Sequence, residues 1–202
     1  MSEQLLTGYS IRRGTTLDQA LLVKFMQRTY QDIFPQEDFS HLARTVEQYF
    51  SSETPLWWVD FVGEGRDHRE EGEQGVWGDR GDHRDQKILN FSSPVSPSSP
   101  ASSSPQTPHT LHTVACTWVG NAIDQVQGGR HAHIFLLYVV PEHRRRGVGT
   151  ALMRYVENWA RSRGDHQIGL QVFKSNTAAL NLYNQLGYQT QSLWMIRSLN
   201  SE

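Results

Sequence analysis

The sequence is poor in the features that define several large classes of protein. Cys116 is the only cysteine in 202 residues, so no disulfide can form within the chain, and a reducing compartment such as the cytoplasm is expected. Met1–Ser10 lacks the basic and then apolar pattern of a signal peptide. No apolar run approaches the about 20 residues that cross a bilayer. The formal charge of −2 favours neither nucleic acid nor a membrane as a partner.

Hydrophobic residues are also few. They make up 37% of the chain, which suffices for one core but suggests that part of the sequence is not packed. Residues 63–108 are rich first in glycine and charged residues and then in serine and proline. Such a segment cannot bury enough surface to offset its ordering entropy. We therefore predict one domain over residues 9–200, interrupted at 63–108 by a disordered insertion that is either a tolerated linker or a phosphorylatable, partner-binding arm.

The remaining sequence alternates between strand and helix patterns. A capping box, Thr16-Leu17-Asp18-Gln19, predicts the start of the first helix, and Gly164 and Gly187 predict the ends of the last two. The expected helices are Leu17–Tyr30, His41–Phe50, Thr150–Arg161 and Ala178–Leu186, and the expected strands are Tyr9–Arg12, Leu56–Val62, Thr113–Val119, His133–Val140, Gln167–Phe173 and Tyr188–Ser198. This order predicts a mixed α/β fold around one sheet. Cys116 lies inside a strand pattern and is expected to be a buried, inert thiol.

The segment from Val139 to Thr150 carries the most chemical information. A buried strand ends at Pro141, a turn with three arginines and two glycines follows, and a helix begins. The first amides of a helix have no intrahelical acceptor and carry the positive end of its dipole. Gly147 and Gly149 leave room for an anion to approach the backbone, so the segment is interpreted as a pyrophosphate cradle. An ordinary solvated basic turn is the alternative, and the sequence matches neither a Walker loop nor a good dinucleotide fingerprint.

Two spaced motifs resemble a known family. Arg144-x-x-Gly147-x-Gly149, and downstream Asn176-x-x-Ala179-x-x-Leu182-Tyr183-x-x-Leu186-Gly187-Tyr188, are similar to the two motifs of the GNAT superfamily of N-acetyltransferases. The resemblance implies a single α/β (mixed α+β) domain with a mostly antiparallel sheet, splayed between its fourth and fifth strands and covered by helices on both faces. It also implies that acetyl-CoA lies in the gap, and that the acetyl group passes directly to an amine.

The resemblance also implies the residues that hold the co-substrate. The pyrophosphate would be held by the turn that begins at Arg144, through the amides of Arg145, Arg146, Gly147, Val148, Gly149 and Thr150. The backbone of Leu137, Tyr138 and Val139 would line the pantetheine arm and polarise the thioester carbonyl, and Asn176 would contact that arm. Tyr183 would lie near the sulfur as the general acid. Its alternative is a core aromatic, because Leu180, Tyr183 and Leu186 also make a packing stripe.

The general base is less well defined by the sequence. Many members of the superfamily carry a glutamate five residues before the motif asparagine, but here Gln171 stands there, and an amide takes no proton at neutral pH. At a second position, where other members carry glutamate or histidine, the chain has His133. An imidazole, with a pKa of about 6.5, suits this role. His131 and bulk water are alternative bases, and both histidines could instead cap the strand end. A third metal ligand is not evident, so no metal is expected.

The sequence leaves the acceptor open. The leading hypothesis is an acetyl-CoA-dependent N-acetyltransferase acting on a small molecule or protein, and the alternative is a non-catalytic acyl-CoA-binding or sensing domain. A nucleic-acid partner has little support, because no second basic cluster with interleaved aromatics accompanies the arginines. The sequence does not indicate the oligomeric state, and a homodimer is possible. Acceptor specificity is expected in Thr29–Phe50, near His131 and in Tyr188–Trp194, where Tyr30, Phe34 and Trp194 suggest an apolar-walled site or simply core packing.

Overall fold

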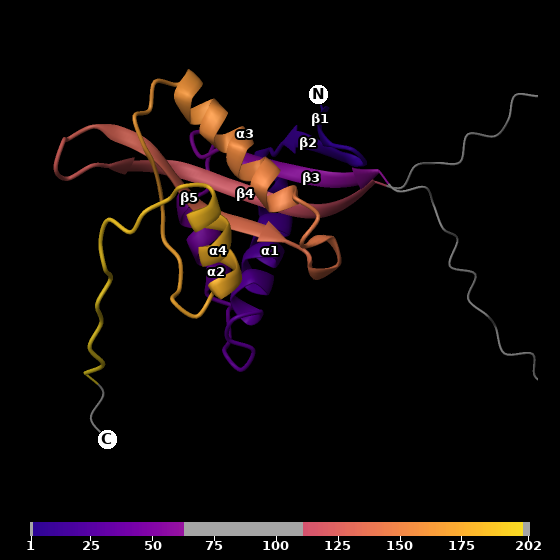
Figure 1. The fold of residues 1–202 in the computed structure, drawn as a ribbon. Coiled ribbons are helices and arrows are strands. Elements are labelled where there is room, and N and C mark those ends of the chain that lie inside the picture. Colours follow the sequence, from indigo (N-terminus) through magenta and orange to yellow (C-terminus); the bar gives the residue numbers. More distant parts are fainter. Residues whose placement is uncertain (1, 63–110, 200–202) are drawn as a thin grey trace, which may run out of the picture. The chain divides into compact units, whose positions relative to one another are not determined.

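A computed structural model describes residues 2–62 and 111–199 of the chain (Figure 1). The described strands are β1 Ser2–Leu6, β2 Tyr9–Arg13, β3 Leu56–Val62, β4 Leu111–Ile123, β5 Arg130–Val139 and β6 Ile168–Leu170. The described α-helices are α1 Gln19–Gln31, α2 Leu42–Tyr49, α3 Val148–Ser162 and α4 Thr177–Gln185, and two short 3-10 helices, η1 Thr16–Asp18 and η2 Pro141–His143, precede α1 and α3. The predicted insertion at 63–108 lies outside the described residues.

The described strands form one sheet in the order in which they occur in the sequence. Each neighbouring pair is antiparallel except β5 and β6, which are parallel. The parallel pairing covers only three residue pairs, from Ala132 with Ile168 to Ile134 with Leu170. Because β5 continues to Val139 while β6 ends at Leu170, the second half of β5 has no partner on that edge among the described strands. The predicted sheet, mostly antiparallel and splayed at these two strands, is therefore confirmed.

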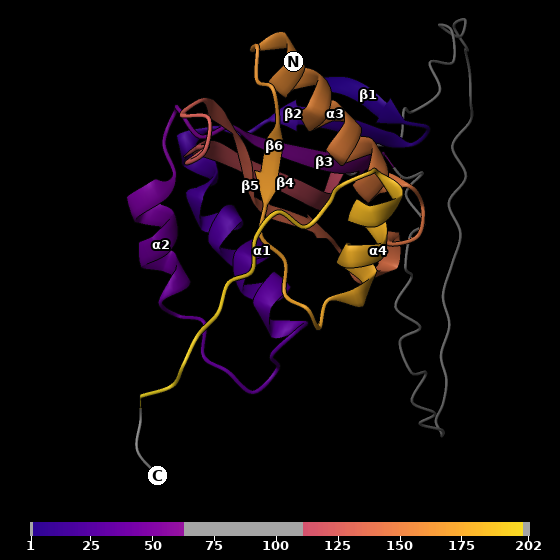
Figure 2. The same ribbon diagram turned by 60° about the vertical axis from the view of Figure 1, so that its left-hand side comes forward.

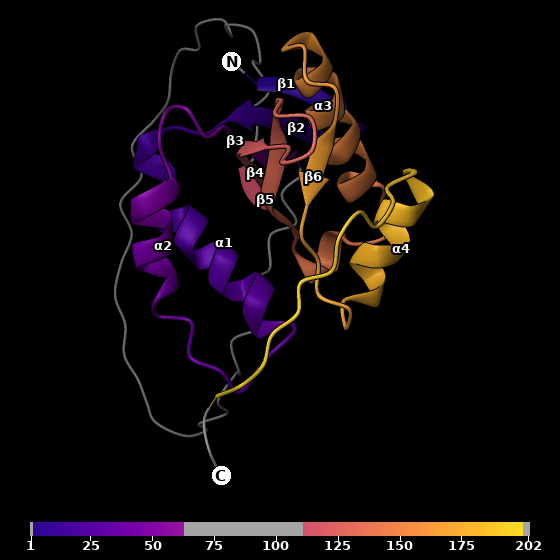
Figure 3. The same ribbon diagram turned by 90° about the vertical axis from the view of Figure 1, so that its left-hand side faces the viewer.

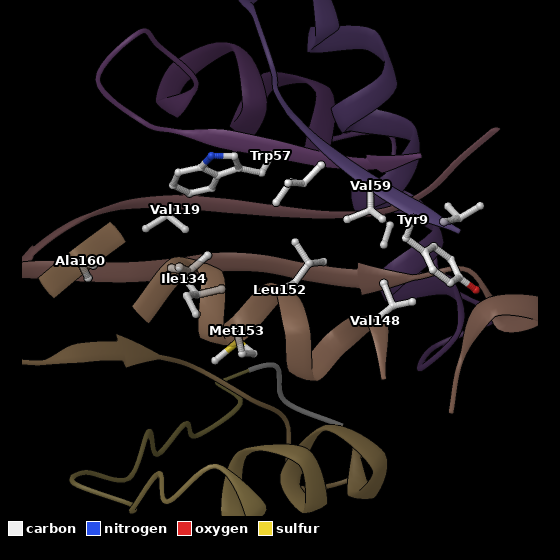
Figure 4. Packing of buried hydrophobic residues seen from close by; sticks show 14 of the residues in the cluster. Tyr9, Trp57, Val59, Val119, Ile134, Val148, Leu152, Met153 and Ala160 are labelled. Carbon is white, nitrogen blue, oxygen red and sulfur yellow. The ribbon is translucent and has the colours of Figure 1, made fainter. Parts of the chain in front are cut away.

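Helices cover both faces of this sheet. In Figure 3, α1 and α2 lie on one side of the strands, and α3 and α4 lie on the other. Figure 4 shows the apolar cluster between the sheet and α3, in which Leu152 and Val156 of α3 are fully buried beside Val59 and Val119 of the sheet. A second cluster packs Leu22 and Val46 of the opposite helices against the other face, which explains why the central strands read as apolar on both faces.

A β-bulge interrupts the pairing of β4 with β5. Trp118 pairs with Leu136 and Val119 pairs with Ile134, so Phe135 is the extra residue. Before the bulge Ala132 and Ile134 face the α3 cluster, whereas after it Leu136 and Tyr138 face the α1 and α2 cluster. The bulge therefore changes which β5 side chains face each layer, next to the point where β5 and β6 part.

Several sequence predictions needed correction at their boundaries. Strand β1 was missed because Ser2–Leu6 has a polar start and is half exposed, yet it pairs with β2 through residues such as Glu3. The capping box lies one residue earlier than predicted: the Asp18 carboxylate accepts from the backbone N–H of Thr15 at 2.7 Å. A short 3-10 turn, η1, follows it, so α1 begins at Gln19 and not at Leu17.

The prediction for the end of the chain was wrong. Tyr188–Ser198 forms no strand and runs away from the sheet (Figure 2), and the strand expected over Gln167–Phe173 is limited to Ile168–Leu170. This tail was expected to form a strand, but a strand needs an edge to pair with. Trp194 and Ile196 are 80% and 85% exposed, so the tail makes few contacts with the fold.

Candidate active site

The predicted anion cradle is an exposed turn between β5 and α3. Arg145 has φ 61 and Gly147, the residue before α3, has φ 82, both in the left-handed region. Glycine is required at the second position by this φ, because L-residues with a Cβ rarely adopt it. The first amides of α3 lie directly behind it, where helix geometry leaves N–H groups without intrahelical acceptors. The structure thus places free donors, a positive helix end and three arginines at one turn.

The two motif glycines serve different purposes. A Cβ added at Gly147 would meet only Leu6 Cδ1, at 3.9 Å, so space does not require glycine here. The positive φ of this residue is what favours glycine. A Cβ added at Gly149 would lie 3.3 Å from Leu182 Cδ2 of α4 and 4.0 Å from Val139 Cγ2 of β5. Gly149 therefore lets the start of α3 approach α4 and the end of β5 closely, which joins the two sequence motifs in space.

Arg144 orders the strand end and not only the turn. Its Nε donates to the carbonyl of Val139 at 2.9 Å, and its Nη2 forms an ion pair with Asp32, just beyond α1. The guanidinium also lies 5.5 Å from the ring centroid of Tyr138. These contacts fix the exit of β5 relative to α1. The partner Asp32 was not identified from the sequence, since no local pattern links residues so far apart.

His133 and His131 lie within β5, three and one residues after its start. Both side chains approach Gly169 of β6: a Cβ there would be 3.2 Å from His131 Nε2 and 3.3 Å from His133 Nδ1. Burial is the main cause that lowers the pKa of His133 below its usual value, and the neighbouring His131 adds to it. His131 contacts Gln167, whose Nε2 lies 3.4 Å from its Nδ1 and donates to Asp124 at 2.9 Å. Both histidines thus lie within β5 and next to Gly169 of β6.

A cavity of about 410 Å³ lies beside His133, between the α1 and α2 helices and the point where β5 and β6 part. Five aromatic side chains line it: Tyr30, Tyr49, Trp118, Phe135 and Phe173. Its other lining residues are Met26, Thr45, His133, Ile134, Gln171 and Val172. The structure thus brings the predicted base and the substituted position Gln171 to one cavity, which suits a small acceptor molecule.

The sequence predicted part of this wall and missed the rest. Tyr30 lines the cavity as expected, and Phe34 packs on Phe173 with ring centroids 5.1 Å apart. Trp194 does not line it and is 80% exposed. Phe135 was missed because its place depends on the fold: its ring lies over Gly120 of β4, where a Cβ would be 2.1 Å from Phe135 Cε2.

The second motif forms α4 as predicted, with Asn176 at the start of the helix and Tyr183 in the apolar core. Asn176 caps the helix, its Oδ1 accepting from the Ala179 amide at 3.1 Å. Tyr183 is 9% exposed and belongs to the cluster beneath α3, with its ring centroid 5.8 Å from that of Tyr188. Burial raises the pKa of Tyr183 to about 12, so its phenol is protonated at neutral pH. It does not line the aromatic cavity.

The remaining predictions concern thiols, metals and membranes. Cys116 is fully buried and burial raises the pKa of its thiol, which fits the expected inert role. Within residues 2–62 and 111–199, no three His, Cys, Asp or Glu side chains gather in a way that could hold a metal ion. No helix in that part of the chain is long and apolar enough to cross a bilayer.

Comparison with known proteins points to the family that the motifs resemble. The model of the acetyltransferase (GNAT) family matches residues 112–188, which include β4, β5, α3, β6 and α4. An uncharacterized N-acetyltransferase of Bacillus subtilis is 40% identical over 52 residues, which are 26% of this chain and 21% of that protein. The thialysine N-epsilon-acetyltransferase of Mus musculus is 38% identical over 61 residues, which are 30% of this chain and 36% of that protein. The chain thus spans well under half of either relative.

The fold agrees over a longer range. A crystal structure of a predicted acetyltransferase from Clostridium acetobutylicum with acetyl-CoA superposes with a TM-score of 0.58, covering 95% of this chain and 96% of that one at 16% identity. This likeness concerns the fold alone. The two motifs that meet at Gly149 lie within residues 112–188, and this segment, from β4 to α4, is the part of the chain that matches the acetyltransferase (GNAT) family.

Proposed function

We propose that this chain is an acetyl-CoA-dependent N-acetyltransferase that moves an acetyl group directly to an amine. One observation carries the proposal: the exposed turn before α3 follows the end of β5, and the cavity beside His133 lies where β5 and β6 part. A thioester bound along the end of β5 would have a phosphate site at one end and an amine site at the other. The comparisons support the family, and the geometry supports the assignment of the two substrates.

The residues of the turn fit the phosphate groups of acetyl-CoA. An exposed left-handed turn at Arg145 and Gly147 presents backbone amides at the start of a helix of fifteen residues, and Arg145 and Arg146 add exposed cationic side chains to it. We assign the pyrophosphate to the amides from Arg145 to Thr150. We assign the pantetheine arm to the unpaired edge of β5 at Leu137–Val139 and to Asn176.

Acyl transfer needs a neutral amine, a polarised carbonyl and a proton for the leaving thiolate. In the proposed reaction the amine nitrogen bonds to the thioester carbon, and its proton passes to the imidazole of His133. The carbon–sulfur bond then breaks, and the sulfur receives a hydrogen bond and a proton from Tyr183. The lowered pKa of His133 keeps it neutral at pH 7, and the raised pKa of Tyr183 keeps its phenol protonated.

A second function has support from two particular residues. Gln171 stands where many members of the superfamily carry a glutamate, and Tyr183 packs in the apolar cluster and outside the cavity. Both observations suit a domain that binds acyl-CoA and does not transfer the acyl group. Such a domain would also use the turn, so cofactor binding alone does not separate the two functions.

The deciding experiment incubates the protein with acetyl-CoA and a mixed library of amines and peptides. An N-acetylated product, identified by mass and absent without the protein, is the expected result. Acetyl-CoA binding without any acetylated product would favour the non-catalytic domain. The proposal involves no metal, no nucleic acid and no membrane, and a reducing compartment such as the cytoplasm suits the single buried thiol, Cys116.

A further inference from the structure

We infer that the aromatic cavity selects a primary amine that is joined to an aromatic or bulky apolar group and carries no second positive charge. The inference rests on the proposed function, because it takes this cavity as the acceptor site. It goes further by naming the chemical class of the acceptor, and it is argued from the charge, the aromatic walls and the polar groups of the cavity.

The cavity wall is uncharged. Of the described residues that line it, none is aspartate, glutamate, lysine or arginine, and the only titratable groups are His133 and the phenols of Tyr30 and Tyr49. Burying an ammonium group away from water is costly unless a carboxylate or several hydrogen-bond acceptors pair with it. A polyamine or an aminoglycoside carries several ammonium groups and would find no carboxylate on these walls. An amine with a single ammonium group becomes uncharged when that group loses its proton, so no charge has to be buried without a partner.

The cavity lining includes two pairs of aromatic rings. Tyr30 and Phe173 meet edge to face, with centroids 6.1 Å apart and planes at 79°. The ring centroids of Trp118 and Phe135 lie 5.0 Å apart, with planes at 59°. Phe173 and Phe135 are 46% and 41% exposed although both are large and apolar. Apolar surface left open at one place in a cavity is typical of a binding site for an apolar ligand.

Aromatic faces also suit the amine as it arrives. The acceptor reaches the protein mainly as an ammonium ion, which aromatic rings attract through their faces. Gln171 and Thr45 give the lining neutral oxygens that can accept hydrogen bonds from an amine, and His133 can take its proton. Because Gln171 is an amide and not a carboxylate, it adds no negative charge that would favour a polycation.

The test compares kcat/KM of the full chain for 2-phenylethylamine and tryptamine with those for spermidine and kanamycin, at saturating acetyl-CoA. We expect the two arylalkylamines to exceed the two polycations by about 100-fold, the cost of two to three kcal/mol for an unpaired buried charge. Values for spermidine or kanamycin equal to or above those for 2-phenylethylamine would overturn the inference.

Two variants sharpen this comparison. Gln171→Glu adds a carboxylate to the cavity with little change of shape. It should raise the ratio of kcat/KM for spermidine to kcat/KM for 2-phenylethylamine by about tenfold. Trp194→Ala is the matched control: it removes an exposed aromatic side chain outside the cavity and should leave the ratio unchanged. A ratio that moves with Trp194→Ala and not with Gln171→Glu would contradict the assignment of this cavity.

Binding alone separates this inference from the proposed function. Calorimetry of the protein with 2-phenylethylamine and with spermidine needs no acetyl transfer. Tighter binding of 2-phenylethylamine, lost in Phe173→Ala, supports the preference of the cavity even if no product forms, and the proposed function would then fail by itself. Equal or tighter binding of spermidine overturns the inference and leaves the proposed transferase intact.

Discussion

His133 combines the two properties that a general base needs here. It lines the aromatic cavity, and burial together with the nearby His131 lowers its pKa below the ordinary value of 6.5. A base must be neutral to accept a proton, and a lowered pKa widens the pH range in which the imidazole is neutral. The rate should therefore be insensitive to this group at pH 7 and decline as the pH falls through its pKa.

The first prediction is that His133→Gln removes this acid limb of the rate profile. Glutamine can form hydrogen bonds but cannot titrate. We therefore expect kcat to fall, and the remaining kcat to lose the decline below pH 6.5 that protonation of His133 causes. The measurement is kcat against pH at saturating acetyl-CoA and acceptor. His131→Gln is the control, and it should keep the limb. An unchanged limb in His133→Gln would assign the proton transfer to His131 or to water.

The second prediction concerns Tyr183. Tyr183→Phe keeps the ring in the cluster under α3 and removes only the hydroxyl, so we expect turnover to fall by about 100-fold with acetyl-CoA affinity little changed. A steady-state rate assay measures kcat, and calorimetry measures the Kd for acetyl-CoA. Unchanged turnover would show that Tyr183 is a packing residue only, the alternative that its burial already suggests.

The site residues differ in how far the sequence could place them. Gly147 was predicted from its place in the motif, as a glycine that leaves room for an anion, but its positive φ was not predicted. The ion pair of Arg144 with Asp32 and the stack of Phe135 over Gly120 were not predictable, because each joins segments that only the fold brings together. The same is true of the cavity as a whole, whose walls come from two helices, two strands and the segment after β6.

At the scale of elements, the turn before α3 does most to define the site. Arg145 and Gly147 both adopt left-handed backbone angles within three residues, which turns successive amides outward at the start of the helix. Strain of this kind persists where the surrounding structure enforces it, and it often marks a binding site.

The third prediction follows from Gly147. Gly147→Ala should lower the free energy of unfolding by about 1–3 kcal/mol, the cost of a left-handed residue with a Cβ, and should weaken acetyl-CoA binding as the turn relaxes. Chemical denaturation and calorimetry measure the two effects. Gly128→Ala is the matched control: Gly128 has φ 71 in the turn between β4 and β5 and no atom within 4 Å of the added Cβ. It should cost similar stability and leave affinity unchanged.

Elements were predictable where their signals are local. Gly164 and Gly187 both have positive φ and end α3 and α4, as their sequence positions indicated. The tail from Tyr188 to Ser198 shows the opposite case. We expected a strand there, but pairing depends on an available edge, and a local sequence pattern carries no information about that edge.

At the scale of the whole molecule, the order of helices and strands was enough to predict a mixed α/β fold around one sheet, and the family resemblance added helices on both faces. Hydrophobic periodicity defines which faces are apolar, and few arrangements bury all of them. The register was beyond reach, because the bulge at Phe135 shifts the pairing by one residue through contacts made across the sheet. That shift decides which side chains of β5 line the cavity, so the fold was predictable and the acceptor site was not.

The fourth prediction concerns the stability of the whole chain with its co-substrate. A ligand that binds only the folded state at 100 times its Kd adds about 2.7 kcal/mol to the free energy of unfolding. For a chain of this size, acetyl-CoA should therefore raise Tm by roughly 5–10 °C. Thermal unfolding with acetyl-CoA and with desulfo-CoA, which keeps the pyrophosphate, should give similar shifts. If neither compound raises Tm, the assignment of a phosphate site to the turn before α3 is wrong.

Transfer of an acetyl group from acetyl-CoA to an amine is tested most directly by the mass of the products after incubation with acetyl-CoA and 2-phenylethylamine. We expect N-acetyl-2-phenylethylamine and free CoA in equal amounts, formed at a rate that His133→Gln reduces. Acetyl-CoA that binds the protein and yields no acetylated amine, from this acceptor or from the amine library, would contradict it.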